Sequence, residues 1–192
     1  MKSSPKIALI LAGSLNLIMG FVEMIASFFS SSSSLFADSL DFFVDGVNYF
    51  SSLFILEKGK KIQEKVGKIK GSLMMILGLG ILVWAGWKYM NGWIPRGEVM
   101  TTIGFLALIV NLLSTWLLQK FQNTSLDLRA VWLCTRNDAL GNILIIIAGY
   151  LTLYFTSAIP DILVSLFMGI LIFRSGVQIV RGGHEGHNHA HH

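Results

Sequence analysis

Cysteine and charged residues are scarce in this sequence. The 192 residues include one cysteine, Cys134, so no disulfide can form within the chain, and this residue says nothing about a redox compartment. Charged residues make up 14% of the chain, whereas hydrophobic residues make up 53%. Soluble domains of this length rarely have such a composition, and no separate soluble domain fits outside the apolar segments. The composition therefore indicates a polytopic membrane protein surrounded by lipid.

Six apolar segments are long enough to cross a membrane, which takes about 20 helical residues. We predict an all-α integral membrane protein, with residues 1–181 forming a single six-helix domain and residues 182–192 a disordered, histidine-rich tail. The first segment follows Lys2 and Lys6, as a signal peptide would. Its length, its polar residues and the lack of a small-residue cleavage site indicate a retained helix instead. The expected transmembrane helices cover 7–27, 35–56, 71–94, 99–119, 128–153 and 160–181.

Basic residues gather in the connectors on one side of these helices. The connector 57–70 alone contains six lysines, whereas the connectors 28–34 and 154–160 have no charge. The positive-inside rule therefore places both termini in the cytoplasm, in a multi-pass protein of a bacterial inner membrane. We interpret the serine run in 28–34 as a flexible, solvated turn.

Three aspartates interrupt the second apolar segment. Asp38, Asp41 and Asp45 share one face of the expected helix, and Asp45 lies about 15 Å from its outer end, near the membrane centre. One such carboxyl group could belong to a polar face that packs against other helices. Three on one face favour an ion or proton pathway, because carboxyl groups inside a membrane are costly.

The fifth segment contains a second polar pair at a similar depth. Cys134 and Asp138 are four residues apart on one helix face, so two antiparallel helices would bring two pairs together. Oxygen and sulfur ligands at four corners suit a tetrahedral cation such as zinc. These ligands lose protons when they bind a metal, so binding and proton release are coupled. A lone cysteine is also common as a small core residue, and both interpretations of Cys134 remain open.

These segments resemble motifs of the cation diffusion facilitator family of divalent-metal/proton antiporters. The stretch SSSSLFADSLDFFVDG is similar to that family's second helix, with Asp41 and Asp45 at its two ligand positions. The stretch LDLRAVWLCTRNDALGNI is similar to the fifth, where Asp138 matches a ligand. The resemblance covers nearly the whole membrane portion. Weaker matches are Asn16 and Glu23 in SLNLIMGFVE, Asn111 in IVNLLSTWLL and Asp161 in IPDILVSL.

The resemblance implies a homodimer that exports zinc, or a similar divalent cation, from the cytoplasm in exchange for protons. The metal is then the transported substrate, held by Asp41, Asp45, Cys134 and Asp138. The chain would be a transporter and not an enzyme, with no nucleic-acid partner. A non-transporting, metal-responsive membrane subunit on the same scaffold is the alternative. Accessory roles are expected for Asp38, Glu23, Asn16, Asn111 and Arg136.

Two features depart from the family pattern. The fifth-helix pair of the family usually begins with histidine, but Cys134 stands there, and the softer sulfur could move the preference toward cadmium or other thiophilic ions. The family also commonly has a cytoplasmic metal-sensing and dimerising domain after the sixth helix, where this sequence has only residues 182–192. We therefore expect the dimer to be held by membrane helices.

Arg136 and the tail are the remaining charged features. Arg136 points away from Cys134 and Asp138, and a buried guanidinium needs a partner, for which Glu23 and Asp161 are the candidates. We favour a structural ion pair over a charge that tunes the metal site. The tail, HEGHNHAHH, could be an interrupted affinity tag, but we favour a native segment that binds metals weakly. Its ligands are His184, His187, His189, His191 and His192.

Overall fold

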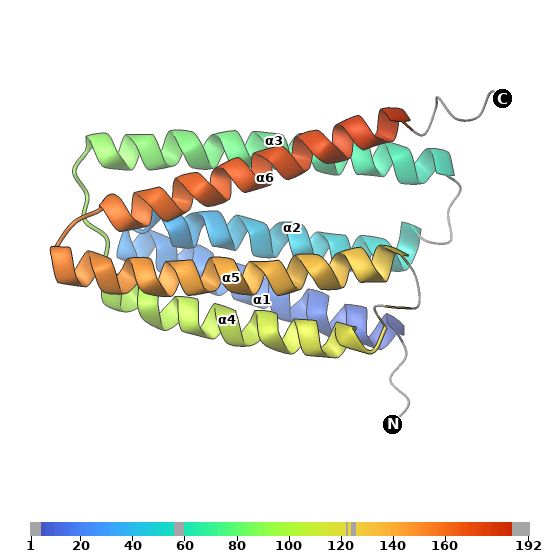
Figure 1. Cartoon of the computed structure of the whole chain (residues 1–192), viewed down its shortest axis with the longest axis horizontal. Helices are drawn as coiled ribbons and strands as arrows, with labels where there is room; N and C mark the ends of the chain where they lie inside the picture. Colours follow the sequence, from blue (N-terminus) through green and yellow to red (C-terminus); the bar gives the residue numbers. More distant parts are fainter. Residues whose placement is uncertain (1–4, 56–59, 122, 124–125, 186–192) are drawn as a thin grey trace.

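The computed structural model describes residues 5–55, 60–121, 123 and 126–185. Side chains at 54–55, 60–61, 63–64, 126–131, 133–134, 136–137 and 182–185 are outside this description. The described part consists of six helices without strands, so the all-α prediction is confirmed (Figure 1). The helices are α1 (Pro5–Ser30), α2 (Ser33–Ile55), α3 (Lys60–Met90), α4 (Gly97–Gln119), α5 (Leu126–Phe155) and α6 (Ile159–Glu185).

Five of the helices are long and apolar enough to cross a membrane, and α2 is the exception. Its length is sufficient at 23 residues, but it contains Asp38, Asp41 and Asp45. The largest difference from the expected boundaries is in α3, which begins at Lys60 instead of residue 71. The lysine-rich stretch expected to be a connector is therefore mostly helical, because lysine is a good helix former and extends the helix beyond the membrane.

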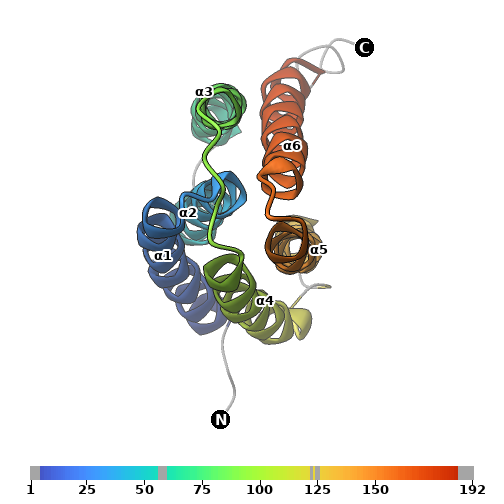
Figure 2. The same ribbon diagram turned by 90° about the vertical axis from the view of Figure 1, so that its left-hand side faces the viewer.

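The helices form two groups (Figure 2). One is the pair of α3 and α6; the other contains α1, α2, α4 and α5, in which α1 packs on α2 and α4 packs on α5. Glycines allow the close approach of α3 and α6, since a Cβ atom on Gly78 would lie 2.8 Å from the carbonyl oxygen of Gly169. Helix α2 contacts α1, α3, α5 and α6, so its polar face is inside the bundle.

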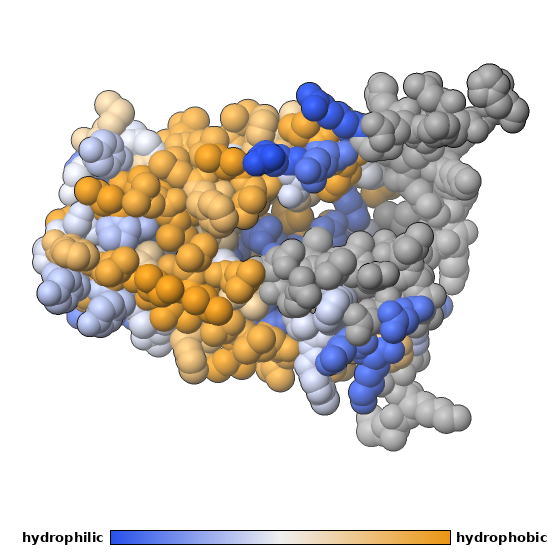
Figure 3. All heavy atoms as spheres, viewed as in Figure 1, coloured by the Kyte–Doolittle hydropathy of each residue, from blue (hydrophilic) through white to orange (hydrophobic). Residues whose placement is uncertain are grey.

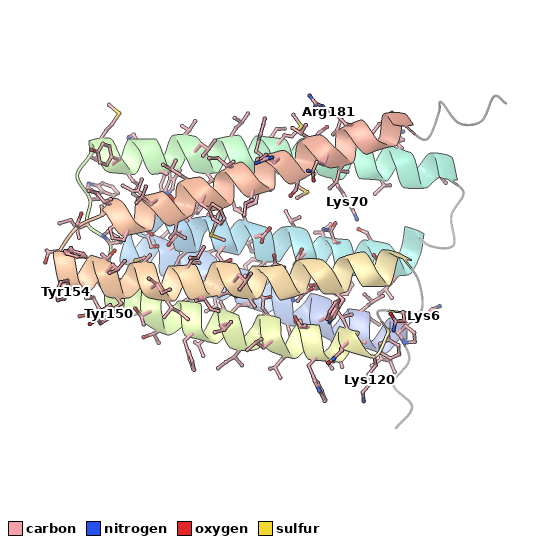
Figure 4. The ribbon with its side chains drawn as sticks, in the orientation of Figure 1. Lys6, Lys70, Lys120, Tyr150, Tyr154 and Arg181 are labelled. Atoms are coloured by element: carbon pink, nitrogen blue, oxygen red, sulfur yellow. The ribbon has the colours of Figure 1, made fainter. Side chains whose placement is uncertain are left out.

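The two ends of the bundle differ in charge. Lys6, Lys70, Lys120 and Arg181 lie toward the end where α1 begins and α6 ends, whereas Tyr150 and Tyr154 lie toward the opposite end (Figure 4). The positive-inside rule makes the lysine-rich end the cytoplasmic end, and we call the opposite one the outer end. Between them, the surface is a broad apolar band, as expected for contact with lipid (Figure 3).

Asp161 joins α6 to the start of α2 at the outer end. Its carboxylate accepts hydrogen bonds from the hydroxyl groups of Ser32 at 2.7 Å and Ser34 at 2.6 Å. It also accepts hydrogen bonds from the backbone N–H groups of Ser33 at 2.7 Å and Ser34 at 2.9 Å. These N–H groups belong to the first turn of α2 and have no partner within the helix itself. We call this arrangement the Asp161 clasp.

The Asp161 clasp corrects one sequence-based interpretation. Residues 32–34 were expected in a flexible, solvated turn, but all three are buried, with at most 1% of their surface exposed. The turn between α1 and α2 is completed by Ser31, whose φ of 59° is in the left-handed region. The serines have a structural role, because they supply the several hydrogen-bond donors that a buried carboxylate requires.

Candidate metal site and interior carboxyl groups

Helices α2 and α5 bring one aspartate each to a shared position in the bundle interior. Asp45 is buried and its carboxyl group lies beside that of half-buried Asp138. Asp41, one turn closer to the outer end on α2, is near enough to both Asp45 and Asp38 to interact with them through its charge. The expected meeting of the two helices is therefore present for Asp45 and Asp138.

One of the four predicted metal ligands, Cys134, has a side chain outside the described part of the structure, so the complete set cannot be placed. Cys134 and Arg136 lie within α5, but their side chains are outside the description, as is the side chain of His184. His187, His189, His191 and His192 of the predicted tail also lie outside the described residues. Among the described side chains, no group of three His, Cys, Asp or Glu is arranged to hold a metal ion.

Two hydroxyl groups that the sequence reasoning missed support the aspartate of α2. Tyr49 donates a hydrogen bond to Oδ2 of Asp45 at 3.3 Å, and the hydroxyl groups of Tyr49 and Thr135 are hydrogen-bonded to each other. Both residues are buried. Their spacing could have revealed them, because Tyr49 follows Asp45 by four residues and Thr135 precedes Asp138 by three. This contact links α2 to α5 beside the aspartate pair and fixes the orientation of Asp45.

A second polar layer lies nearer the outer end. Asp38 precedes Asp45 by seven residues, which corresponds to about 10 Å along α2. Asn142 of α5 donates a hydrogen bond to Oδ2 of Asp38 at 2.6 Å and accepts one from Asn111 of α4 at 2.8 Å. On the other side, Asp38 lies next to the carboxyl group of Glu23 from α1. Four helices thus contribute to this layer.

Asn142 is a residue of this layer that sequence reasoning missed, although it follows Asp138 by one helical turn on the same face. Asn16, in contrast, is not bonded to the acids. Its side chain donates to Oγ of Ser114 at 3.2 Å and to the backbone oxygen of Ala12 at 2.9 Å, so it connects α1 to α4.

The structure excludes one of the two partners considered for Arg136. Asp161 is at the outer end, whereas Arg136 precedes the outer end of α5, Phe155, by 19 residues, or about 28 Å of helix. The Asp161 carboxylate is instead occupied by the serines of the clasp. An ion pair between Arg136 and Glu23 stays a prediction.

The apolar band is interrupted near the cytoplasmic end. On the face seen in Figure 3, a hollow lies between the two helix groups, and hydrophilic residues are visible within it. At the outer end, the Asp161 clasp and a backbone hydrogen bond of 2.9 Å from Arg96 to Ser30 tie the connectors together. On this face the described surface is hollowed between the helix groups, whereas hydrogen bonds join the connectors at the outer end.

A bundle of membrane helices with paired carboxyl groups in its interior is the architecture of an ion transporter. Comparison with family models agrees, because the cation efflux transmembrane domain matches residues 9–183. The chain therefore belongs to the cation efflux family, the cation diffusion facilitators that its motifs resemble, and this is a family of transporters and not of enzymes.

Two curated relatives come from bacteria, and both are named "Cadmium, cobalt and zinc/H(+)-K(+) antiporter". The protein of Bacillus subtilis (strain 168) is 28% identical over 124 residues, and that of Bacillus velezensis is 27% identical over 124 residues. Each match covers 64% of this chain but only 40% of the relative. The membrane helices and these bacterial relatives agree with a multi-pass protein of a bacterial inner membrane.

Proposed function

We propose that the chain exports a divalent metal cation from the cytoplasm in exchange for protons, with the cation held between α2 and α5. The observation that carries this proposal is the contact between the carboxyl groups of Asp45 and Asp138 in the interior of a membrane bundle. Two acids that meet there from different helices need a cation or protons to offset their charge.

The full ligand set of this proposal consists of Asp41, Asp45, Cys134 and Asp138. Its support is the helical spacing of each pair and the meeting of Asp45 with Asp138. Carboxylate and thiolate ligands must be deprotonated to bind a metal. Protons that enter from the outer side would therefore displace the metal, and metal from the cytoplasm would displace the protons.

Zinc and cadmium are the substrates that this ligand chemistry favours. Zinc accepts mixed oxygen and sulfur ligands in a tetrahedral site, and the thiolate of Cys134 would add preference for softer ions. The names of both relatives include cadmium, cobalt and zinc, which supports the same range. A homodimer held by transmembrane helices and weak metal binding by the histidine-rich tail stay predictions.

Transport by the purified chain in proteoliposomes tests the proposal. Zinc or cadmium is added outside, and its entry is followed with an indicator inside while a pH gradient is imposed in either direction. We expect entry to be faster when the interior is more acidic, because protons then leave as the metal enters. Absence of metal entry at every gradient would favour the non-transporting subunit instead.

A further inference from the structure

Glu23 and Asp38 form a carboxyl pair that the proposed metal site does not use. Glu23 comes from α1 and Asp38 from α2, and the surfaces exposed by their side chains are 0% and 1%. The carboxyl groups lie side by side without the geometry of a regular hydrogen bond, and both oxygens of Glu23 lack a hydrogen-bond partner. A buried carboxyl group without a donor is costly, so this position requires an explanation.

Among the described side chains, none supplies a positive charge to this pair. The charged groups that act most strongly on Glu23 are Asp38 and Asp41, both acids. Asp38 receives one hydrogen bond, from the neutral amide of Asn142. The other buried or half-buried acids among the described side chains of the bundle are Asp45 on α2, Asp138 on α5 and, at the outer end, Asp161 on α6.

Basic side chains of the packed helices lie elsewhere among the described residues. Lys88 of α3 is near Asp161 and faces the rings of Trp84 and Trp93, whereas Arg174 of α6 is exposed. The side chain of Arg136 is outside the described residues; its backbone position on α5 precedes Asn142, the residue bonded to Asp38, by six residues, or about 9 Å toward the cytoplasm.

The atoms available to a ligand here are hard oxygen acceptors. Asn111, which is hydrogen-bonded to Asn142 and through it linked to Asp38, has a further buried oxygen, Oδ1, without a hydrogen-bond partner. Sulfur and imidazole are absent from this group. Oxygen atoms alone suit protons and hard cations better than zinc or cadmium.

We propose that Glu23 and Asp38 hold a monovalent counter-ion, separately from the divalent metal between α2 and α5. Two adjacent carboxyl groups without solvent cannot both remain charged unless a cation is present. A proton shared by the pair or a potassium ion on its oxygens would meet this requirement. The inference rests on the proposed function, and Asp41, which interacts with both Asp38 and Asp45, would couple the two sites.

The test measures metal entry into proteoliposomes containing the full chain, with one monovalent gradient at a time. In one arm the gradient is of pH at equal potassium, and in the other it is of potassium at equal pH. The variant Glu23→Gln keeps the size of the side chain but removes its charge. We expect this variant to bind the metal as the unaltered chain does and to let the metal enter down its own gradient. Acceleration by one of the two monovalent gradients should fall, and only the contribution of protons that compete at the metal ligands should remain.

The arm in which acceleration falls shows whether the counter-ion held by Glu23 and Asp38 is a proton or a potassium ion. Glu98→Gln is the matched control, since Glu98 is exposed at the start of α4 and the same change there should leave both arms unaltered. Asp38→Asn is the second variant and should reproduce the loss. Normal acceleration in both variants overturns the inference but leaves the proposed function intact, whereas lack of transport by the unaltered chain contradicts the proposed function.

Stability of the variants provides a second criterion. If one carboxyl group is already neutralised, Glu23→Gln and Asp38→Asn should both fold, because an amide resembles a protonated carboxyl group. Failure of both variants to fold would overturn the inference, since the pair would then be a structural element that needs its charge.

Discussion

Asp161 and Glu23 are both fully buried acids, but their surroundings are opposite. The carboxylate of Asp161 accepts four hydrogen bonds from three consecutive serines at the outer end. Both oxygens of Glu23 lack a hydrogen-bond partner, and the group beside it is another acid. The chemical group and the burial are thus the same, and the hydrogen-bond donors differ.

This difference separates a structural acid from one available to a ligand. A carboxylate with four donors is stable as an anion and connects helices, because each charge-assisted bond offsets part of its desolvation. Carboxyl groups without donors are stable only when a proton or another cation is present. Among the acids of the interior, Asp38 and Asp45 receive one described side-chain donor each and Glu23 receives none, so these acids need a proton or another cation, whereas Asp161 is stabilised by the donors of the clasp.

The largest effect is expected from removing charge at the metal site. Asp45→Asn or Asp138→Asn should abolish transport of every divalent ion, because the cation is then no longer neutralised at the membrane centre. Metal entry into proteoliposomes measures the loss. As a control for folding, gel filtration in detergent should show the same amount of folded protein for each variant as for the unaltered chain. Transport of any divalent ion at the original rate would remove the aspartate from the site.

Breaking the Asp161 clasp should affect stability more than chemistry. Asp161→Ala leaves the donors of Ser32, Ser33 and Ser34 unpaired, so we expect the free energy of unfolding to fall by roughly 3 kcal/mol. Thermal unfolding in detergent measures this fall, with Glu98→Ala at an exposed position as the control. A change below about 0.5 kcal/mol, as for ordinary surface substitutions, would contradict the structural role.

A smaller effect concerns the choice of metal. If Cys134 is a ligand, Cys134→Ser should weaken cadmium transport more than zinc transport, because a hydroxyl group is a poor substitute for a polarisable thiolate. A change of about tenfold in the ratio corresponds to 1.4 kcal/mol. Cys134→His should shift the preference toward zinc. Equal loss for both metals in Cys134→Ser would indicate packing, and unaltered transport would exclude Cys134.

The smallest effect is expected at the hydroxyl group that orients Asp45. Tyr49→Phe removes the 3.3 Å hydrogen bond and its link to Thr135, which is worth about 1 kcal/mol. We expect metal affinity, measured by calorimetry, to fall by about fivefold, as 1 kcal/mol implies. Tyr89→Phe on the exposed surface of α3 should leave the affinity unaltered. Similar affinity in both variants would mean that Asp45 is held by other contacts.

The sequence predicted the features that depend on periodicity and local charge. Apolar length indicated the helices, and the four-residue spacing of Asp41 and Asp45 placed them on one face. The bonds of Ser32 to Asp161 and of Asn142 to Asp38 join residues 129 and 104 positions apart. Such contacts depend on how the helices pack. The sequence alone therefore predicted a solvated turn for the serine run and did not predict the contact of Asn142 with Asp38.

The comparison of the two kinds of acid is tested most directly by zinc entry into proteoliposomes containing equal amounts of folded Asp45→Asn or Asp161→Asn protein. Both substitutions replace a buried aspartate by its neutral isostere, so they differ only in the surroundings of the side chain. We expect Asp161→Asn, despite lower stability, to retain most of the transport rate per folded molecule, whereas Asp45→Asn retains none. Full activity in Asp45→Asn, or complete loss of activity in folded Asp161→Asn, would show that the two acids do not differ in this way.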